Sequence, residues 1–126
     1  MSLSILLVDD SKIVRKVIAK ELPIIFRDQE LKLTEATNGE EALTYLFANN
    51  YDLVFLDLTM PVKTGYEVLE ALKEKGVRAN IIVLTADIQP DAEKIVRELG
   101  AIGYIKKERP FNTNPLMKIL QDTGML

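Results

Sequence analysis

Apolar and polar residues follow two alternating patterns along the chain. Short segments that are almost entirely apolar are typical of buried β-strands, and the longer segments between them carry one apolar stripe with helical spacing. One segment, 31–37, instead alternates apolar and polar side chains, as a half-buried strand does. The predicted strands are 3–10, 31–37, 51–58, 80–86 and 101–107, and the predicted helices are 11–22, 38–50, 64–76, 90–100 and 114–122.

The first helix has signals at both ends. Ser11 or Asp10 can cap its N-terminus through a side-chain oxygen. Pro23 is expected to end or kink the helix, because proline lacks the backbone N–H. We expect one apolar stripe on each of the first two helices to face the core. These stripes are Ile13, Val14, Val17, Ile18 and Leu22 on the first helix, and Ala42, Leu43, Leu46 and Phe47 on the second.

The alternation of strands and helices predicts an α/β fold. Strand–helix–strand units form right-handed crossovers, so the five strands make a parallel sheet with helices on both faces. Coverage on both faces explains why the strands are so apolar. The chain shows no repeat, linker or low-complexity tract, and we expect residues 1–126 to form a single domain. In such sheets, ligands bind beyond the carboxyl ends of the strands.

The composition restricts the classes of function. The chain is 48% hydrophobic and 28% charged, and its net charge of −3 argues against direct nucleic-acid binding. No apolar segment approaches the ~20 residues that span a bilayer, and no secretory signal follows Met1. Cysteine is absent, so the chain has no disulfide framework and no thiolate site. We therefore expect a cytoplasmic protein that does not bind membranes.

Histidine is also absent. The chain therefore lacks the commonest general base and the commonest metal ligand, and it cannot carry a phosphohistidine. Any bound metal has to be held by oxygen atoms, which favours magnesium, manganese or calcium.

Side chains suited to chemistry lie at the carboxyl ends of four predicted strands. These residues are Asp9 and Asp10, Asp57, Thr85, and Lys106 and Lys107. If the four strands are neighbours, the side chains meet on one rim, where three carboxylates repel one another unless a cation joins them. Magnesium suits such a cluster, and a hydroxyl and an ammonium can bind phosphoryl oxygens. Asp57 is then well placed as a nucleophile that becomes an aspartyl phosphate.

Each of these residues also has a structural explanation when it is taken alone. Asp9 and Asp10 can be helix-capping acids, and Asp57 can be an acid that serves a turn. Thr85 can be an ordinary β-branched strand residue, and lysines at a strand end are usually solvated. Their joint occurrence at four strand ends favours the functional interpretation.

Five motifs in order give the chain a family resemblance. They are "VDD" at 8–10, "LDLTMP" at 56–61, "GYEVL" at 65–69, "VLTA" at 83–86 and "GAIGYIKK" at 100–107. Together they resemble the response-regulator receiver domains of two-component signalling, over almost the whole chain. The resemblance implies a flavodoxin-like, doubly wound five-stranded parallel sheet with strand order 2-1-3-4-5 and five helices.

The resemblance also implies a magnesium site. Asp57 would be the phosphoacceptor and a metal ligand, and Asp10 would bind Mg²⁺ directly. Asp9 would act largely through water, and the backbone carbonyl of Thr59 would complete the metal shell. Thr59 and Asp87 occupy positions where the family varies the lifetime of the phosphate.

Three further residues would serve the phosphoryl group and the response to it. Thr85 would donate a hydrogen bond to the phosphoryl group, and Lys107 would assist its transfer. Tyr104 would be an aromatic switch that turns inward afterwards.

The position of the lysine departs from the family pattern. The family usually has proline directly after this lysine, often with a cis bond, whereas Glu108 and Arg109 separate Lys107 from Pro110 here. Counting from Tyr104 assigns the lysine place to Lys107, and counting back from Pro110 assigns it to Arg109. We favour Lys107, because a strand fixes its register and a loop need not. A cis bond before Pro110 stays open.

Two functions from different classes fit these residues. In the first, a partner histidine kinase, a phosphotransfer protein or a small phosphodonor phosphorylates Asp57. The domain then catalyses only its own phosphorylation and dephosphorylation, and it changes a surface formed by helix 91–99, the fifth strand and the last helix. That surface would bind a separate downstream protein or a second copy of the chain.

The second function is a phosphatase of the haloacid dehalogenase class, which also uses an aspartate nucleophile and magnesium. That class requires a second aspartate two residues after the first, where this chain has Thr59. The pattern does not settle whether the chain acts alone or is part of a larger protein.

Overall fold

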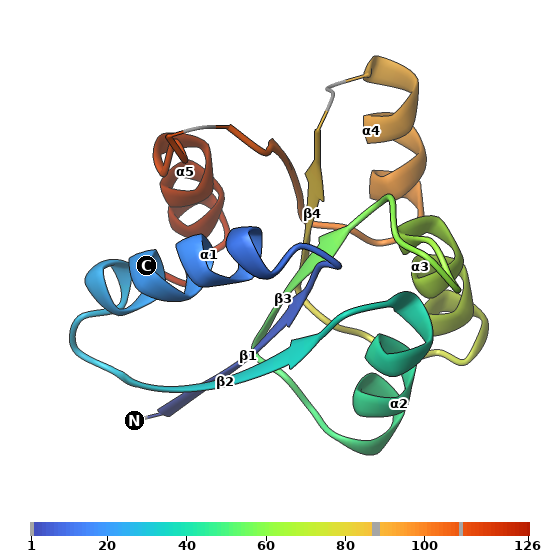
Figure 1. Cartoon of the computed structure of the whole chain (residues 1–126), viewed down its shortest axis with the longest axis horizontal. Coiled ribbons are helices and arrows are strands. Elements are labelled where there is room, and N and C mark those ends of the chain that lie inside the picture. The colour runs from blue at the N-terminus through green and yellow to red at the C-terminus, as the bar shows by residue number, and fades with distance from the viewer. Residues whose placement is uncertain (1, 87–88, 109) are drawn as a thin grey trace.

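The structure is a computed structural model that describes residues 2–86, 89–108 and 110–126. Strands and helices alternate, and the strands form one parallel sheet with the order β2-β1-β3-β4-β5 (Figure 1). The elements are β1 Ser2–Val8, α1 Lys12–Ile25, β2 Glu30–Ala36, α2 Gly39–Ala48, β3 Leu53–Asp57, α3 Gly65–Glu74, β4 Ile81–Thr85, α4 Pro90–Glu98, β5 Gly103–Lys106 and α5 Asn114–Asp122. The predicted fold class and strand order are confirmed.

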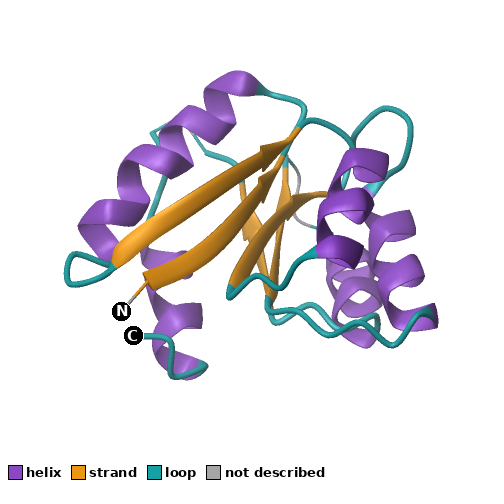
Figure 2. Ribbon diagram, turned by 90° about the horizontal axis from the view of Figure 1, so that it is seen from below, coloured by secondary structure: helices purple, strands orange, loops and turns teal. Residues whose placement is uncertain are grey.

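The helices cover both faces of the sheet, as Figure 2 shows. One core lies under α1 and α5, with Ile18 and Leu116 fully covered. The other lies under α2, α3 and α4, around Val68 and Val96. All five residues of β3 are buried, because this central strand has helices on both faces. None of the described helices combines the length and the apolar composition needed to cross a bilayer.

The sheet register aligns the carboxyl ends of the central strands. Val8 of β1 pairs with Leu56 of β3, and Asp57 pairs with Leu84 of β4. Residues that end β1 and β3 therefore lie side by side at one edge of the sheet.

Helix α1 shows how tertiary packing overrides a local signal. Ser11 caps it, since its Oγ accepts a hydrogen bond from the Val14 amide at 3.3 Å. The helix continues through Pro23 to Ile25, so an end at Pro23 is wrong. A proline inside a helix costs about 3 kcal/mol or more. The next residue after the helix, Phe26, is 2% exposed in the core, and its burial offsets part of that cost.

Three residues of the predicted apolar stripes face outward. Ile13, Val17 and Phe47 are 57%, 37% and 49% exposed, so their assignment to the core is wrong. The rest of the stripe on helix α1 was predicted correctly, because Val14, Ile18 and Leu22 pack on the sheet. An outward residue sits next to a buried one in sequence, because successive positions are 100° apart around a helix.

Candidate functional site

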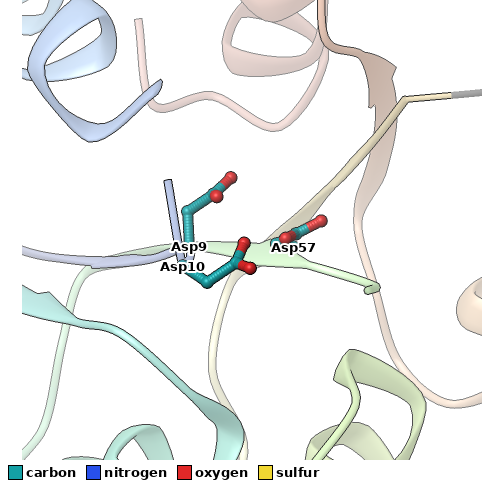
Figure 3. Close-up of side chains that lie close together, drawn as sticks. All are labelled: Asp9, Asp10 and Asp57. Carbon is teal, nitrogen blue, oxygen red and sulfur yellow. The ribbon is translucent and has the colours of Figure 1, made fainter. Parts of the chain in front are cut away.

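Three carboxylates meet where β1 and β3 end (Figure 3). One oxygen from each of Asp9, Asp10 and Asp57 lies within 4.8 Å of the other two. Asp9 and Asp57 are buried, with 1% and 2% exposure, whereas Asp10 is exposed to solvent. The structure therefore brings together the three acids that the sequence placed at strand ends.

Lys107 is the cation that contacts this acidic cluster. Its Nζ lies 2.8 Å from Asp9 Oδ2 and 3.0 Å from Asp57 Oδ1. Its backbone N–H donates to Thr85 O at 2.7 Å, which ties it to the end of β4, and the preceding Lys106 is exposed. Burial alone would lower the pKa of Lys107, but its hydrogen bonds to Asp9 and Asp57 outweigh burial and raise it. Lys107 therefore stays protonated at neutral pH.

Asp57 has an unusual electrostatic environment for a surface-rim acid. Burial raises its pKa to about 6, and the charge of Asp9 acts in the same direction, while Lys107 and the Thr59 amide act against them. Oδ1 accepts from the Thr59 N–H at 3.3 Å. Oδ2 is buried, and within the described ranges it has no hydrogen-bond partner.

The donor set of the cluster suits a hard divalent cation. Asp9 Oδ1 accepts from the Ser11 N–H at 2.8 Å, and Asp9 Oδ2 contacts Lys107. Among the described residues, one ammonium thus contacts two of the three carboxylates, and the buried Oδ2 of Asp57 has no hydrogen-bond partner. Oxygen-only ligands with excess negative charge are those that magnesium binds in proteins. The residues present therefore fit the group that the sequence predicted.

The structure describes three of the other predicted residues. Thr85 ends β4 and is half-buried, and Thr59 is exposed, two positions beyond Asp57. Tyr104 is 8% exposed, and its hydroxyl accepts from the Gln89 N–H at 3.4 Å. Arg109 and Asp87 lie outside the described residues, as does the peptide bond that joins Arg109 to Pro110.

The loop between β3 and α3 holds the end of β3 tightly against α3. A Cβ on Gly65 would clash with the backbone of Asp57 and Leu58, and the Gly65 N–H donates to Leu58 O at 3.0 Å. Within the loop, Val62 has φ +71°, and Lys63 N–H donates to Pro61 O at 2.9 Å. This geometry is that of a classic γ-turn, which is rare and strained.

The sequence interpretation missed one residue that touches the site. Arg15 donates from its guanidinium to the backbone carbonyl of Asp9 and pairs with Glu35 at 2.7 Å. Arg15 is close to Asp9 and Asp10 in sequence, but its contact also requires Glu35 on β2, which is distant in sequence.

The chain matches known proteins over nearly its whole length. The family model described as "Response regulator receiver domain" matches residues 5–121. The chain is 34% identical over 123 residues to the chemotaxis protein CheY of Halobacterium salinarum, with 97% of both chains covered. It is also 34% identical to the transcriptional regulatory protein DltR of Streptococcus agalactiae, of which it spans 48%.

Solved structures give the same result. The chain resembles CheY4 of Vibrio cholerae with a TM-score of 0.78 and 30% identity, covering 97% of this chain and 98% of that one. It resembles the response regulator TrrA of Thermotoga maritima, solved in complex with Mg²⁺-BeF, with a TM-score of 0.76 and 34% identity over 95% and 97% of the two chains. Fold, motifs and relatives agree, and the chain belongs to the response-regulator receiver domains of two-component signalling systems.

Proposed function

We propose that Asp57 accepts a phosphoryl group in a magnesium-dependent reaction and that this modification changes a protein-interaction surface. The donor would be the phosphohistidine of a partner histidine kinase or phosphotransfer protein in the cytoplasm. The observation that carries the proposal is a buried Asp57 carboxylate, 3.0 Å from the Lys107 ammonium and within 4.8 Å of two further carboxylates.

Four residues would hold the metal. Asp10 and Asp57 would bind it through carboxylate oxygens, Asp9 largely through water, and Thr59 through its backbone carbonyl. When bound, Mg²⁺ neutralises charge on the acids and on the incoming phosphoryl group. A related structure supports a magnesium site, since TrrA of Thermotoga maritima was solved in complex with Mg²⁺-BeF.

The chain's own groups supply the transfer chemistry. With a pKa of about 6, Asp57 is mostly ionised at neutral pH and can act as a nucleophile. An Asp57 oxygen forms a bond to phosphorus while the bond from phosphorus to the donor's imidazole nitrogen breaks, and the imidazole leaves. Lys107 would pair with a phosphoryl oxygen, and the Thr85 hydroxyl would donate a hydrogen bond to another. Both donors stand at strand ends that the sheet holds rigidly.

Tyr104 would connect the site to the output surface. Its ring is buried, and its hydroxyl is held by the amide of Gln89, the residue that precedes α4. A movement of Thr85 towards the phosphoryl group would favour this inward position over an outward one. Since coupling of this kind is typically worth ~1–3 kcal/mol, the phosphoryl group would shift an existing equilibrium. The surface of α4, β5 and α5 would then bind a downstream protein or a second copy of the chain.

A stoichiometry experiment separates this function from a phosphatase. With Mg²⁺ and a small acyl phosphate, the chain should take up one phosphoryl group and release it slowly, and it should not turn over phosphate monoesters. Sustained turnover of monoesters would contradict the proposal and favour the haloacid dehalogenase class. The sequence also argues against that class, because Thr59 occupies the position where the class has its second aspartate.

The switch has its own test. Amide NMR spectra recorded with and without beryllofluoride, a stable phosphoryl mimic, should differ in α4 and at Tyr104 as well as around Asp57. Shifts confined to the surroundings of Asp57 would remove the switch and leave the phosphorylation chemistry standing.

A further inference from the structure

Arg15 joins three elements next to the acidic cluster. It lies on α1, and its side chain is only 11% exposed. Its Nη1 donates to the backbone carbonyl of Asp9, directly after β1, and its Nε lies 2.7 Å from Glu35 Oε1 on the edge strand β2. Two nitrogens of one planar guanidinium thus donate to acceptors from two neighbouring segments, the backbone just after β1 and a side chain on β2.

The Asp9 carbonyl belongs to the peptide group that links Asp9 to Asp10. The Asp9 carboxylate has contacts of its own, with the Ser11 amide and with Lys107, both at 2.8 Å. The Asp10 carboxylate is exposed and, in the described part of the chain, forms no hydrogen bond or ion pair. Its position beside Asp57 therefore depends on the orientation of the backbone, and Arg15 holds the peptide group that sets this orientation.

The charge of Arg15 acts against a metal at this site. A cation close to the carboxylates repels a second cation, and Glu35, with a side chain 54% exposed, compensates that charge only in part. If Arg15 strengthens metal binding, it has to do so through geometry, because its positive charge alone weakens the binding of a second cation. The planar guanidinium suits such a role, since it donates from two nitrogens in fixed directions, whereas a lysine ammonium cannot reproduce that fork.

We propose that Arg15 is a positioning residue that fixes the Asp9–Asp10 peptide group and so places Asp10 to bind the metal. The role deepens the proposed function and rests on it. Residues outside the ligand shell that orient metal ligands typically contribute a factor of 10–100 to affinity. We expect the lower end of that range, because Arg15 orients Asp10 through the backbone.

Geometry and charge predict opposite results for one substitution. In Arg15→Gln, a purely electrostatic role predicts tighter Mg²⁺ binding, since a nearby positive charge is lost. The positioning role predicts a dissociation constant about tenfold higher. Arg15→Lys keeps the charge and loses the fork, so positioning predicts that it too binds Mg²⁺ more weakly. The matched control is Arg97→Gln. Arg97 lies on α4, and it likewise pairs with a glutamate, Glu93, at 3.0 Å and donates to a backbone carbonyl, that of Ile102.

The experiment titrates the metal-free full chain and its variants with Mg²⁺ and follows the amide NMR signals of Ser11 and Thr59. Hydrogen exchange of the Ser11 amide in the metal-free state gives a second readout that needs no activity, and it should be about tenfold faster in both Arg15 variants. Melting curves report whether each variant is folded, and Arg15→Lys is the milder change. The positioning role is overturned if the wild-type chain binds Mg²⁺ and both Arg15 variants bind it equally well or more tightly. A wild-type chain that binds no Mg²⁺ at this rim would instead overturn the proposed function, and this role with it.

Discussion

Two aspartates flank the apolar core of β3, Asp52 just before its first residue and Asp57 at its last. Asp52 is exposed, and its carboxylate accepts from the Ser4 amide at 2.8 Å, so it joins the start of β3 to β1. Asp57 is buried beside two acids and one lysine, and its Oδ2 has no partner among the described residues. The same side chain is a structural acid at one end of the strand and the proposed phosphoacceptor at the other.

The comparison shows what the fold contributes to the site. A parallel sheet aligns the carboxyl ends of all its strands, so acids from β1 and β3 meet there and repel one another. At the opposite end, the Asp52 carboxylate accepts from the backbone amide of Ser4, which stabilises its charge. The two ends differ in the groups that the neighbouring segments place beside the aspartate: carboxylates and a lysine at Asp57, and a backbone amide at Asp52.

The largest effect is expected for Lys107→Ala. Loss of the ammonium leaves Asp9 and Asp57 buried without their cation, and removal of one partner of a buried ion pair typically destabilises a protein by about 3–5 kcal/mol. Phosphorylation should also slow by roughly 10²-fold, the range for loss of one preorganised donor. Urea denaturation without Mg²⁺ measures the stability.

The control for this prediction is Lys106→Ala, which removes the same side chain from an exposed neighbouring position. It should change the free energy of unfolding by less than about 0.5 kcal/mol. Equal effects of the two substitutions would show that the ion pairs with Lys107 do not stabilise the site.

The next effect concerns pH and Asp57→Asn. The folded pKa of Asp57, about 6, lies above the ordinary value of 3.8, so ionisation of Asp57 disfavours the folded state. This cost is complete well above pH 6 and falls as the pH drops towards 3.8, because the folded group then becomes protonated. Asp57→Asn should therefore stabilise the metal-free chain by roughly 1–3 kcal/mol at pH 7.5 and by less than about 1 kcal/mol at pH 4.

Asp52→Asn should do the opposite at the other end of β3, because it weakens a charged hydrogen bond to Ser4 and costs up to about 1 kcal/mol. Thermal unfolding at the two pH values measures both variants. A gain for Asp57→Asn that persists unchanged at pH 4 would refute the electrostatic cause.

A smaller effect is expected for Asp10→Ala. Asp10 adds a negative charge to the cluster but is exposed, so water screens it. The metal-free variant should be as stable as the wild type or up to about 1 kcal/mol more stable, and it should bind Mg²⁺ more weakly. Calorimetric titration measures the affinity, and an unaltered affinity would place the ion elsewhere.

The smallest effects on stability are expected for substitutions at two residues with positive φ angles. Val62, in the loop next to the site, has φ +71°, and Gly76, at the far end of α3, has φ +70°. A β-branched residue is strained there and glycine is not, so Val62→Gly should stabilise the chain by about 0.5–1 kcal/mol. Gly76→Ala should destabilise it by a similar amount, although its Cβ would meet open space. If Val62→Gly destabilises the chain, the loop is not strained at this residue.

The fold was largely predictable because its signals are local. Apolar strands such as β3 and amphipathic helices such as α3 are visible as patterns, and their alternation determines a parallel sheet. Helix ends and faces were less predictable, because they depend on packing. The burial of Phe26 carries α1 past Pro23, and the choice of which row meets the sheet leaves Ile13 and Phe47 outside.

The candidate site was predictable to the extent that strand ends determine it. Asp9 and Asp57 meet because β1 and β3 are neighbours, and Lys107 follows from the register of β5. The contact from Arg15 to Asp9 and Glu35 depends on how α1 lies across β1 and β2, which no local pattern encodes. The strained turn at Val62 was also hidden, since its residue type gives no signal for positive φ.

The central claim is that Asp57 accepts the phosphoryl group and that Asp52 does not. The most direct measurement is mass spectrometry of the chain after incubation with a small acyl phosphate, with and without Mg²⁺, followed by peptide mapping. We expect one phosphoryl group on Asp57 in the wild type and in Asp52→Asn, only when Mg²⁺ is present, and none in Asp57→Asn. Modification of Asp57→Asn to the wild-type level, or a phosphoryl group mapped to another residue, would contradict the claim.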